Sequence, residues 1–219
     1  MKSAVVLPLK EANAKFRMSR LLSADERARL AWAMFEDVAR ALARLPPSTP
    51  VIVVTSSGRA IERARALGWR ALREHEQISE SASVDRACRL LAEEGFEAAL
   101  RIPADVPLIE PEDVELVLDA APGPSATVLV PSRDGLGTNA LLRRPPDLFP
   151  ARFGPNSLVL HRQEALRAQA EIRVLELARL ALDLDEASDL VEFLESRSET
   201  ETRRALETLG IDERVARHA

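Results

Sequence analysis

Short apolar segments alternating with amphipathic segments are the feature that most limits how this chain folds. Eight short runs rich in Val, Ile, Leu and Ala are separated by stretches with apolar residues at helical spacing. Several runs lack polar alternation, which is typical of strands buried on both faces of a parallel sheet. The pattern therefore predicts an α/β fold of three layers, in which helices cover both faces of a mostly parallel central sheet.

End signals set the expected bounds of these elements. Ser23 and Glu26 form a capping box before a helix that Pro46 stops, and glycines close two further helices. The expected strands are 4–8, 51–55, 69–72, 98–102, 126–131, 138–143, 172–175 and 181–184. The expected helices are 24–45, 58–67, 83–94, 112–120, 155–169, 189–196 and 199–209, with Pro155 in the first turn of its helix and Ser188 as the cap of the next.

Length and composition predict one large domain with a tail. The 219 residues exceed an average domain, and 46% hydrophobic with 30% charged residues suits a globular protein. We expect a domain over 1–196 and a C-terminal helical appendage over 197–219. One cysteine, Cys88, excludes a disulfide framework and a multi-cysteine zinc site. The first apolar run stops at Pro8, too short for a signal or membrane segment, so the expected location is cytoplasmic.

The charge distribution predicts an anion site near the start of the chain. A net charge of -5 disfavours nucleic-acid binding, because phosphate backbones need a basic face. Residues 1–29 nevertheless carry seven basic and three acidic side chains, giving +4 and leaving -9 elsewhere. Only Lys2, Lys10 and Lys15 among the 30 basic residues are lysine. Compact ammonium groups suit phosphate binding, although chance clustering near a chain end is the alternative.

Acidic and hydroxyl side chains follow several expected strands, where open parallel sheets bind their ligands. Asp183 and Asp185 lie two apart, so an extended backbone points them to the same side. With Asp105 from another strand end they form a candidate oxygen site for Mg²⁺. Gly154 and Ser157, at an expected helix start, are candidates for holding a phosphate. The plainer alternatives are solvated acidic turns and a simple helix cap.

Seven short motifs resemble those of the guanylyltransferases that activate a phosphorylated small acid during assembly of the deazaflavin coenzyme F(420). The resemblance covers about residues 4–195, and the motifs are specific when taken together. The matching segments are Pro8-Leu9-Lys10, Ala14-Lys15-Phe16-Arg17, Leu22 to Arg27, Pro103 to Leu108, Gly137 to Leu141, Arg152 to Ser157 and Asp183 to Leu190.

This resemblance implies a Rossmann-like nucleotidyltransferase fold, Mg²⁺ as cofactor, and two substrates, GTP and a small phosphorylated carboxylic acid. The acid would be 3-phospho-D-glycerate, 2-phospho-L-lactate or phosphoenolpyruvate, and GMP transfer to its phosphate would release pyrophosphate. The implied site has catalytic Lys10, Lys15 and Arg17, nucleotide-binding Leu7, Pro8, Ser83 and Asp85, acceptor-binding Thr138, Asn139, Gly154 and Ser157, and metal-binding Asp105, Asp183 and Asp185.

The chain departs from the resembled family at 80–87, which reads Glu-Ser-Ala-Ser-Val-Asp-Arg-Ala where relatives have Gly-Leu-Asn-Ala-Ala. Extra polar groups at 81–86 would favour 3-phospho-D-glycerate, the acceptor with a free hydroxyl. Two other functions stay open: a nucleotidyltransferase for another phosphorylated metabolite, and a non-catalytic nucleotide-binding module. Pyrophosphate release would separate catalysis from binding. A homodimer through an amphipathic helix is a further expectation.

Overall fold

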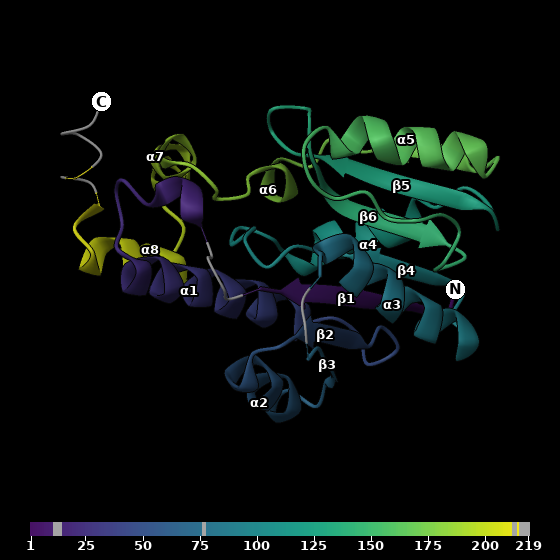
Figure 1. Cartoon of the computed structure of the whole chain (residues 1–219), viewed down its shortest axis with the longest axis horizontal. Helices are drawn as coiled ribbons and strands as arrows, with labels where there is room; N and C mark the ends of the chain where they lie inside the picture. The colour runs from purple at the N-terminus through teal and green to yellow at the C-terminus, as the bar shows by residue number, and fades with distance from the viewer. Residues whose placement is uncertain (11–14, 76–77, 212–213, 215–219) are drawn as a thin grey trace.

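Seven strands form one sheet in the computed structural model, which describes residues 1–10, 15–75, 78–211 and 214. The strands are β1 (Ser3–Leu9), β2 (Val51–Thr55), β3 (Arg70–Arg73), β4 (Ala98–Arg101), β5 (Ala126–Pro131), β6 (Thr138–Arg144) and β7 (Glu171–Val174). Their order across the sheet is β3-β2-β1-β4-β6-β5-β7 (Figure 1). Neighbouring strands run parallel except at β6, which is antiparallel to both β4 and β5. The predicted mostly parallel sheet is confirmed.

Helices cover both faces of this sheet. They are α1 (Ala24–Leu42), α2 (Gly58–Ala66), α3 (Glu80–Glu93), α4 (Pro111–Asp119), α5 (Ser157–Arg167), α6 (Ala178–Ala181), α7 (Ala187–Glu195) and α8 (Glu201–Thr208), with a 3₁₀ turn η1 (Phe16–Met18). Buried residues of α1, α2 and α4 pack on the face that carries Val5 and Leu7. Those of α3 pack behind Val6, and α5 packs behind Leu141. Alternate residues of β1 thus serve two cores, which is the three-layer arrangement that the sequence predicts.

Three helices begin away from their predicted positions. The Ser79 hydroxyl accepts from Ala82 N, so α3 begins at Glu80 and not at residue 83. Asn156 is in the left-handed region with φ 57°, so α5 begins after Pro155. Glu186 and Asp189 form a capping box for α7, in place of the expected Ser188 cap. At α3 and α7 a side chain accepts from the first backbone N–H groups, and this sets the start of the helix. At α5 the left-handed backbone of Asn156 sets it, with no side-chain cap.

The expected strand at 181–184 is wrong. Ala181 is the last residue of α6, and 182–184 lie outside the sheet. The segment bonds to loops and to the Asn139 side chain of β6. Leu184 N donates to Asp105 O at 3.1 Å, and Arg133 N donates to Ala181 O at 2.9 Å. The sequence alternation is nevertheless real, because Leu182 and Leu184 are buried while Asp183 and Asp185 face a cavity. Alternation shows which side chains are buried, and it does not supply a neighbouring strand.

The reversed direction of β6 places its first residues at the end of the sheet where β1 and β4 finish, which we call the functional edge. Parallel strands β1 and β4 end there, at Leu9 and Arg101. Because β6 is antiparallel to β4, Thr138 and Asn139 begin at that same edge. Residues from three adjacent strands therefore meet where open α/β sheets bind ligands.

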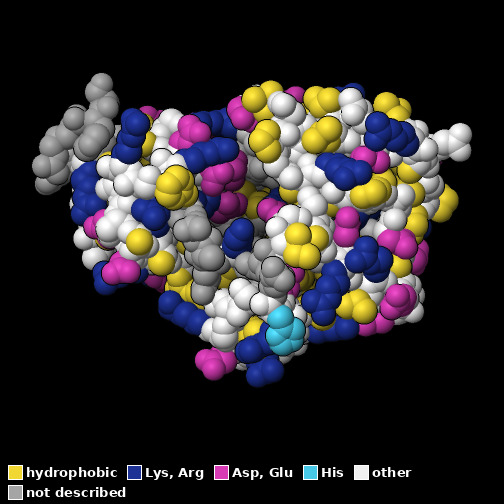
Figure 2. Space-filling view, in the orientation of Figure 1, with side chains coloured by type: hydrophobic (Ala, Val, Ile, Leu, Met, Phe, Trp, Pro, Cys, Tyr) yellow, Lys and Arg dark blue, Asp and Glu magenta, His cyan; other side chains and the backbone are white. Residues whose placement is uncertain are grey.

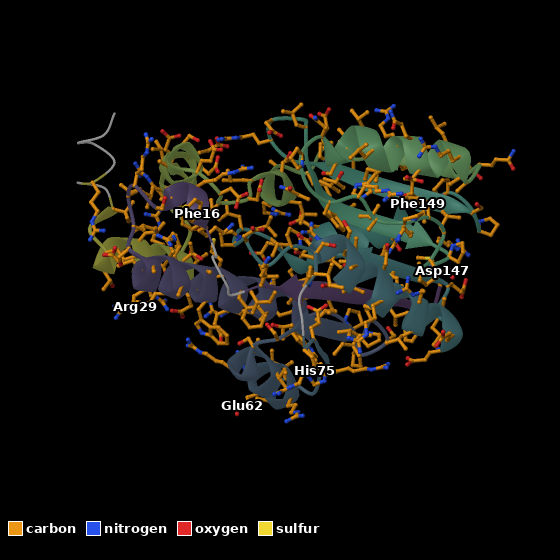
Figure 3. All side chains as sticks on the ribbon, in the orientation of Figure 1. Phe16, Arg29, Glu62, His75, Asp147 and Phe149 are labelled. Carbon is orange, nitrogen blue, oxygen red and sulfur yellow. The ribbon has the colours of Figure 1, made fainter. Side chains whose placement is uncertain are left out.

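A second apolar cluster joins the chain's last helices to the main domain. It combines Met18 of η1, Met34 of α1, Leu184, Phe193 of α7 and Leu206 of α8. Figure 1 shows α1, α7 and α8 gathered at one end of the molecule, and Figure 3 labels Phe16 of η1 at that end. Within the described ranges, no helix is long and apolar enough to cross a membrane.

A buried carboxylate fixes α8 on α1. Asp37 of α1 is 5% exposed and accepts from Glu201 N at 2.8 Å, Thr202 N at 2.8 Å and Thr202 Oγ1 at 2.7 Å. These are the first donors of α8, which have no partner inside their own helix. The expected appendage over 197–219 is thus packed on α1 where the structure describes it.

We expect Asp37→Ala to lower the free energy of unfolding by about 3 kcal/mol, because it leaves buried N–H donors unsatisfied. Urea unfolding at pH 7 measures this change. Glu115→Ala, at an exposed position of α4, is the control and should change stability by no more than about 0.5 kcal/mol. Equal effects of the two substitutions would contradict the role of Asp37.

Candidate active site

Two adjoining cavities open at the functional edge of the sheet. The first, of about 370 Å³, is lined by the end of β1, the start of α3 and the loop after β4. The second, of about 490 Å³, is lined by the start of β6, the residues before α5 and the segment 183–189. Their shared lining consists of Glu80, Arg101, Pro103, Asp105 and Asp185. Figure 2 shows acidic and basic side chains around a hollow on this side of the molecule.

Lys15 binds two of the three predicted metal-binding carboxylates. Its Nζ lies 2.6 Å from Asp105 Oδ2 and 2.6 Å from Asp185 Oδ1, and its side chain is 7% exposed. Burial alone would lower the pKa of Lys15, and the two carboxylates outweigh it, so this pKa lies above its ordinary value. Burial would likewise raise the pKa of Asp105, but Lys15 holds it below the ordinary value. Lys15 and Asp105 are therefore both charged at neutral pH.

Asp183 is the carboxylate that Lys15 does not contact through an ion pair. Burial, followed by repulsion from Asp105 and Asp185, raises the pKa of Asp183 to about 6. Asn139 Nδ2 opposes this by donating to Asp183 Oδ1 at 3.0 Å. An acid with a raised pKa among other carboxylates marks a place where negative charge is incompletely neutralised.

The chemistry of these groups fits a divalent cation. Asp105, Asp183 and Asp185 carry three negative charges when ionised and Lys15 carries one positive charge, which leaves a charge of -2. Carboxylate oxygens are the donors that Mg²⁺ prefers. In the part of the chain that the structure describes, no three His, Cys, Asp or Glu side chains are arranged to hold a metal as they stand. The Lys15 ammonium group lies between the carboxylates of Asp105 and Asp185.

The predicted acceptor-binding residues Thr138, Asn139, Gly154 and Ser157 all line the second cavity. Two backbone N–H groups at the expected helix-start site already have partners, because Ser157 N donates to Gly154 O and Leu158 N donates to Leu136 O. Asn139 Nδ2 is also used inside the protein, on Leu180 O at 2.9 Å and on Asp183. Of these four predicted residues, Thr138 and Ser157 have hydroxyl groups that can donate to a ligand.

The predicted nucleotide-binding residues divide between the cavity and the protein interior. Pro8 and Ser83 line the first cavity. Leu7 is fully buried in the core, and Asp85 accepts from Arg143 Nη1 at 2.7 Å and from Ala151 N at 3.1 Å. Sequence alone does not show this use of Asp85, because Arg143 lies 58 residues away.

The three cations predicted to be catalytic also differ in their surroundings. Lys10 lines the first cavity and is exposed. Arg17 lines the second cavity with its side chain 65% exposed, 3.8 Å from Asp185 Oδ2. Ala14, which begins the Lys15 motif, lies outside the described residues. Lys10 and Arg17 are thus accessible to ligands, whereas Lys15 is enclosed by carboxylates.

The unusual polar segment at 81–86 contributes little to either cavity. Ser81 Oγ accepts from Phe153 N at 2.9 Å, Asp85 pairs with Arg143, and Arg86 donates to Arg73 O on the surface. Only Ser83 of this segment lines a cavity, and its hydroxyl donates to Glu74 at 2.5 Å. The structural reason for favouring 3-phospho-D-glycerate is therefore lost.

Arg101, which sequence analysis missed, lines both cavities together with Glu80. Arg101 is 7% exposed, forms an ion pair with Glu80, and lies 4.3 Å over the Phe153 ring. Its Nη1 donates to Asn139 O at 2.8 Å. A signal was present in the sequence, since Arg101 is a charged residue inside the otherwise apolar run 98–102.

We expect Asp183→Asn to stabilise the protein at pH 8 by about 1–3 kcal/mol. The folded pKa of about 6 exceeds the unfolded value of 3.8, so ionisation costs stability as the pH rises through this range. Asparagine keeps an acceptor for Asn139 and carries no charge. Urea unfolding between pH 4.5 and pH 8 should show the advantage shrinking at lower pH.

Asp185→Asn is the matched comparison, because it removes a partner of Lys15 and should destabilise the protein. If both substitutions shift stability in the same direction, the assignment of repulsion to Asp183 is wrong.

Solved structures with the same arrangement are nucleotide transferases. A Desulfovibrio desulfuricans G20 protein assigned as a nucleotide-diphospho-sugar transferase matches with TM-score 0.77 and 16% identity, covering 99% of this chain and 97% of that one. A nucleotidyl transferase from Methanothermobacter thermautotrophicus matches with TM-score 0.65 and 19% identity, covering 89% and 96%. The fold is therefore that of the nucleotidyltransferases.

The family is defined by closer matches. The model described as "Guanylyl transferase CofC like" matches residues 3–219, and the chain belongs to this family. A phosphoenolpyruvate guanylyltransferase of Rubrobacter xylanophilus is 41% identical, over 84% of this chain and 90% of the relative. A 2-phospho-L-lactate guanylyltransferase of Methanothermobacter thermautotrophicus is 33% identical, over 95% and 92%. A 3-phospho-D-glycerate guanylyltransferase of Colwellia psychrerythraea is 32% identical, over 87% and 90%. The resemblance inferred from the motifs is confirmed.

Proposed function

We propose that this protein transfers GMP from GTP to the phosphate of a small phosphorylated carboxylic acid and releases pyrophosphate. The observation that carries the proposal is the pair of adjoining cavities with Lys15, Asp105 and Asp185 at their junction. Two anionic substrates in adjacent cavities would meet at this junction. The names of the relatives support guanylyl transfer to such acids.

The reaction proposed is attack by an acceptor phosphate oxygen on the α-phosphorus of GTP. A new P–O bond forms there, and the bond to the β-phosphate oxygen breaks as pyrophosphate leaves. A phosphate monoester has its second pKa near about 6, so the attacking oxygen is already ionised at neutral pH. No general base is needed, and the site's task is to align and neutralise two polyanions.

Charged side chains around the junction suit that task. Lys10 would bind phosphate in the first cavity, and Arg17 would bind phosphate in the second. Asp105, Asp183 and Asp185 would hold Mg²⁺. When bound, this ion supplies Lewis-acid stabilisation of phosphate charge. Lys15 would keep Asp105 and Asp185 together through its two ion pairs.

Phosphoenolpyruvate is the acceptor that we propose first. The 41% identical relative is named for it, and the structure removes the earlier reason for preferring 3-phospho-D-glycerate. A role in assembly of the deazaflavin coenzyme F(420) is the part of the proposal that rests on family resemblance alone.

A pyrophosphate-release assay tests the function. Purified protein with GTP, MgCl₂ and each of the three acids should release pyrophosphate only when an acceptor is present, with products identified by mass. Competition at equal concentrations ranks the acceptors. Asp105→Asn should lower kcat by about 10²-fold or more if it removes a metal ligand. GTP binding without pyrophosphate release for any acceptor would favour a non-catalytic module, and turnover only with another nucleotide would favour a different transferase.

Lys10→Ala should weaken the binding of one substrate by about 1–3 kcal/mol, which is the range of a hydrogen bond to a charged group. KM values for GTP and for the acceptor, measured separately, identify which substrate Lys10 binds. Lys2→Ala is the control, because Lys2 Nζ bonds Glu94 O and lies outside both cavities. An unchanged KM and kcat for both substrates would exclude a direct role of Lys10.

A further inference from the structure

His161 lies behind the wall of the second cavity and does not line it. It belongs to α5, is fully buried, and has the Phe153 ring edge-on at 4.9 Å between centroids. Its two ring nitrogens have different partners. Nε2 lies 2.8 Å from Arg152 N, and Nδ1 lies 2.9 Å from Thr138 Oγ1. One ring therefore connects the backbone before α5 with a hydroxyl of the acceptor cavity.

The backbone partner determines where the ring proton is. Arg152 N–H is a donor and cannot accept, so Nε2 must be the unprotonated acceptor nitrogen. In a neutral imidazole the proton is then on Nδ1, which donates to Thr138 Oγ1. Burial, with the nearby cations Arg143, Arg101 and Arg152, lowers the pKa of His161 to about 3, which agrees with a neutral ring.

This contact determines the direction of the Thr138 hydroxyl. A hydroxyl has one proton and two lone pairs, and His161 occupies a lone pair. Thr138 is 5% exposed and lines the second cavity. Within the described chain, its hydroxyl has no protein acceptor among its hydrogen bonds. Its proton is therefore available to a ligand in the cavity.

The Ser157 hydroxyl also accepts a hydrogen bond from the protein, in this case from a backbone N–H group. Its Oγ accepts from Thr138 N at 2.8 Å, and its side chain, at 2% residue exposure, lines the same cavity. Two neighbouring hydroxyls thus have an oxygen lone pair filled by the protein. Each hydroxyl can therefore donate its proton to an anionic oxygen of a ligand in the cavity.

We propose that His161 is a positioning residue that directs the Thr138 hydroxyl proton toward the anionic group of the acceptor. The proposal rests on the proposed function for the identity of the ligand. The orientation itself depends only on residues of this chain. His161 acts through Thr138 and does not touch the substrate.

The orientation has a direct spectroscopic test. Long-range ¹H–¹⁵N correlation spectra of protein with ¹⁵N-labelled histidine should show His161 protonated at Nδ1 and unprotonated at Nε2. Thr138→Val, which removes the hydroxyl at nearly constant volume, should shift the Nδ1 resonance. A proton on Nε2, or on both nitrogens at pH 7, overturns the proposal.

Steady-state kinetics test the consequence for the acceptor. His161→Phe keeps a ring and removes both nitrogens, and it should raise the phosphoenolpyruvate KM by about 10-fold or more. The KM for GTP should stay within about twofold. His161→Gln, whose amide can donate to Thr138 and accept from Arg152, should restore most of the acceptor affinity. Thermal unfolding checks that each variant is folded.

A double-mutant cycle separates positioning from a general structural effect. In the Thr138→Val background, His161→Phe should raise the acceptor KM by less than about threefold, because the hydroxyl to be directed is gone. His75→Phe, at an exposed histidine labelled in Figure 3, is the matched control and should change neither KM. Independent, multiplicative effects of the two substitutions, or equal losses for GTP and acceptor, overturn the positioning role.

The two proposals fail in different ways. If no acceptor is turned over, the proposed function is wrong, while the tautomer spectrum still decides the orientation of Thr138. If phosphoenolpyruvate is turned over and His161→Phe leaves its KM unchanged, guanylyl transfer stands and the positioning role is wrong.

Discussion

The ammonium group of Lys15 between Asp105 and Asp185 is the contact on which the site depends. It connects the chain after β1, the loop after β4 and the segment after α6, which come from distant parts of the sequence. A buried ion pair of this kind is costly to break, because the remaining partner is left as an uncompensated charge. The charge of Lys15 therefore holds three segments at the sheet edge, in a place where apolar packing would exclude the substrates.

A second connection runs through Arg101 and divides the site in two. Its guanidinium contacts Glu80 at the start of α3, the Phe153 ring and the backbone of β6. Arg101 Nε has no hydrogen-bond partner among the described residues. Its contacts with Glu80, Phe153 and β6 hold Arg101 where the cavity beside β1 adjoins the cavity beside β6, and Arg101 lines both.

Sequence patterns predicted the sheet well because each strand has a local signal. The buried runs at 51–55 and 126–131 match β2 and β5 at both ends. The antiparallel direction of β6 had no local signal, because direction depends on pairing with β4 and β5. The prediction of a strand at 181–184 was wrong for the same reason, because the alternation is a local pattern and strand pairing depends on distant residues.

In the candidate site, too, local features could be predicted and contacts between distant residues could not. Cations and acids after strand ends were identified from residue type and position, and Lys15, Asp105 and Asp185 do meet. Residue type did not reveal that Asp85 forms an ion pair with Arg143 or that His161 forms a hydrogen bond with Thr138. Those roles arise from pairs 58 and 23 residues apart, which only the folded chain brings together.

The alternation of Leu182, Asp183, Leu184 and Asp185 gives this segment an unusual sensitivity to length. The two leucines anchor in the cluster beneath α1, α7 and α8, and the two carboxylates face the cavity. Inserting or deleting one residue within the segment would exchange the two sets, since side chains on extended backbone alternate with a period of two. Leucines would then face the cavity, and carboxylates would enter the apolar cluster. Evolution can change the side chains here one at a time, whereas the spacing has to change in steps of two.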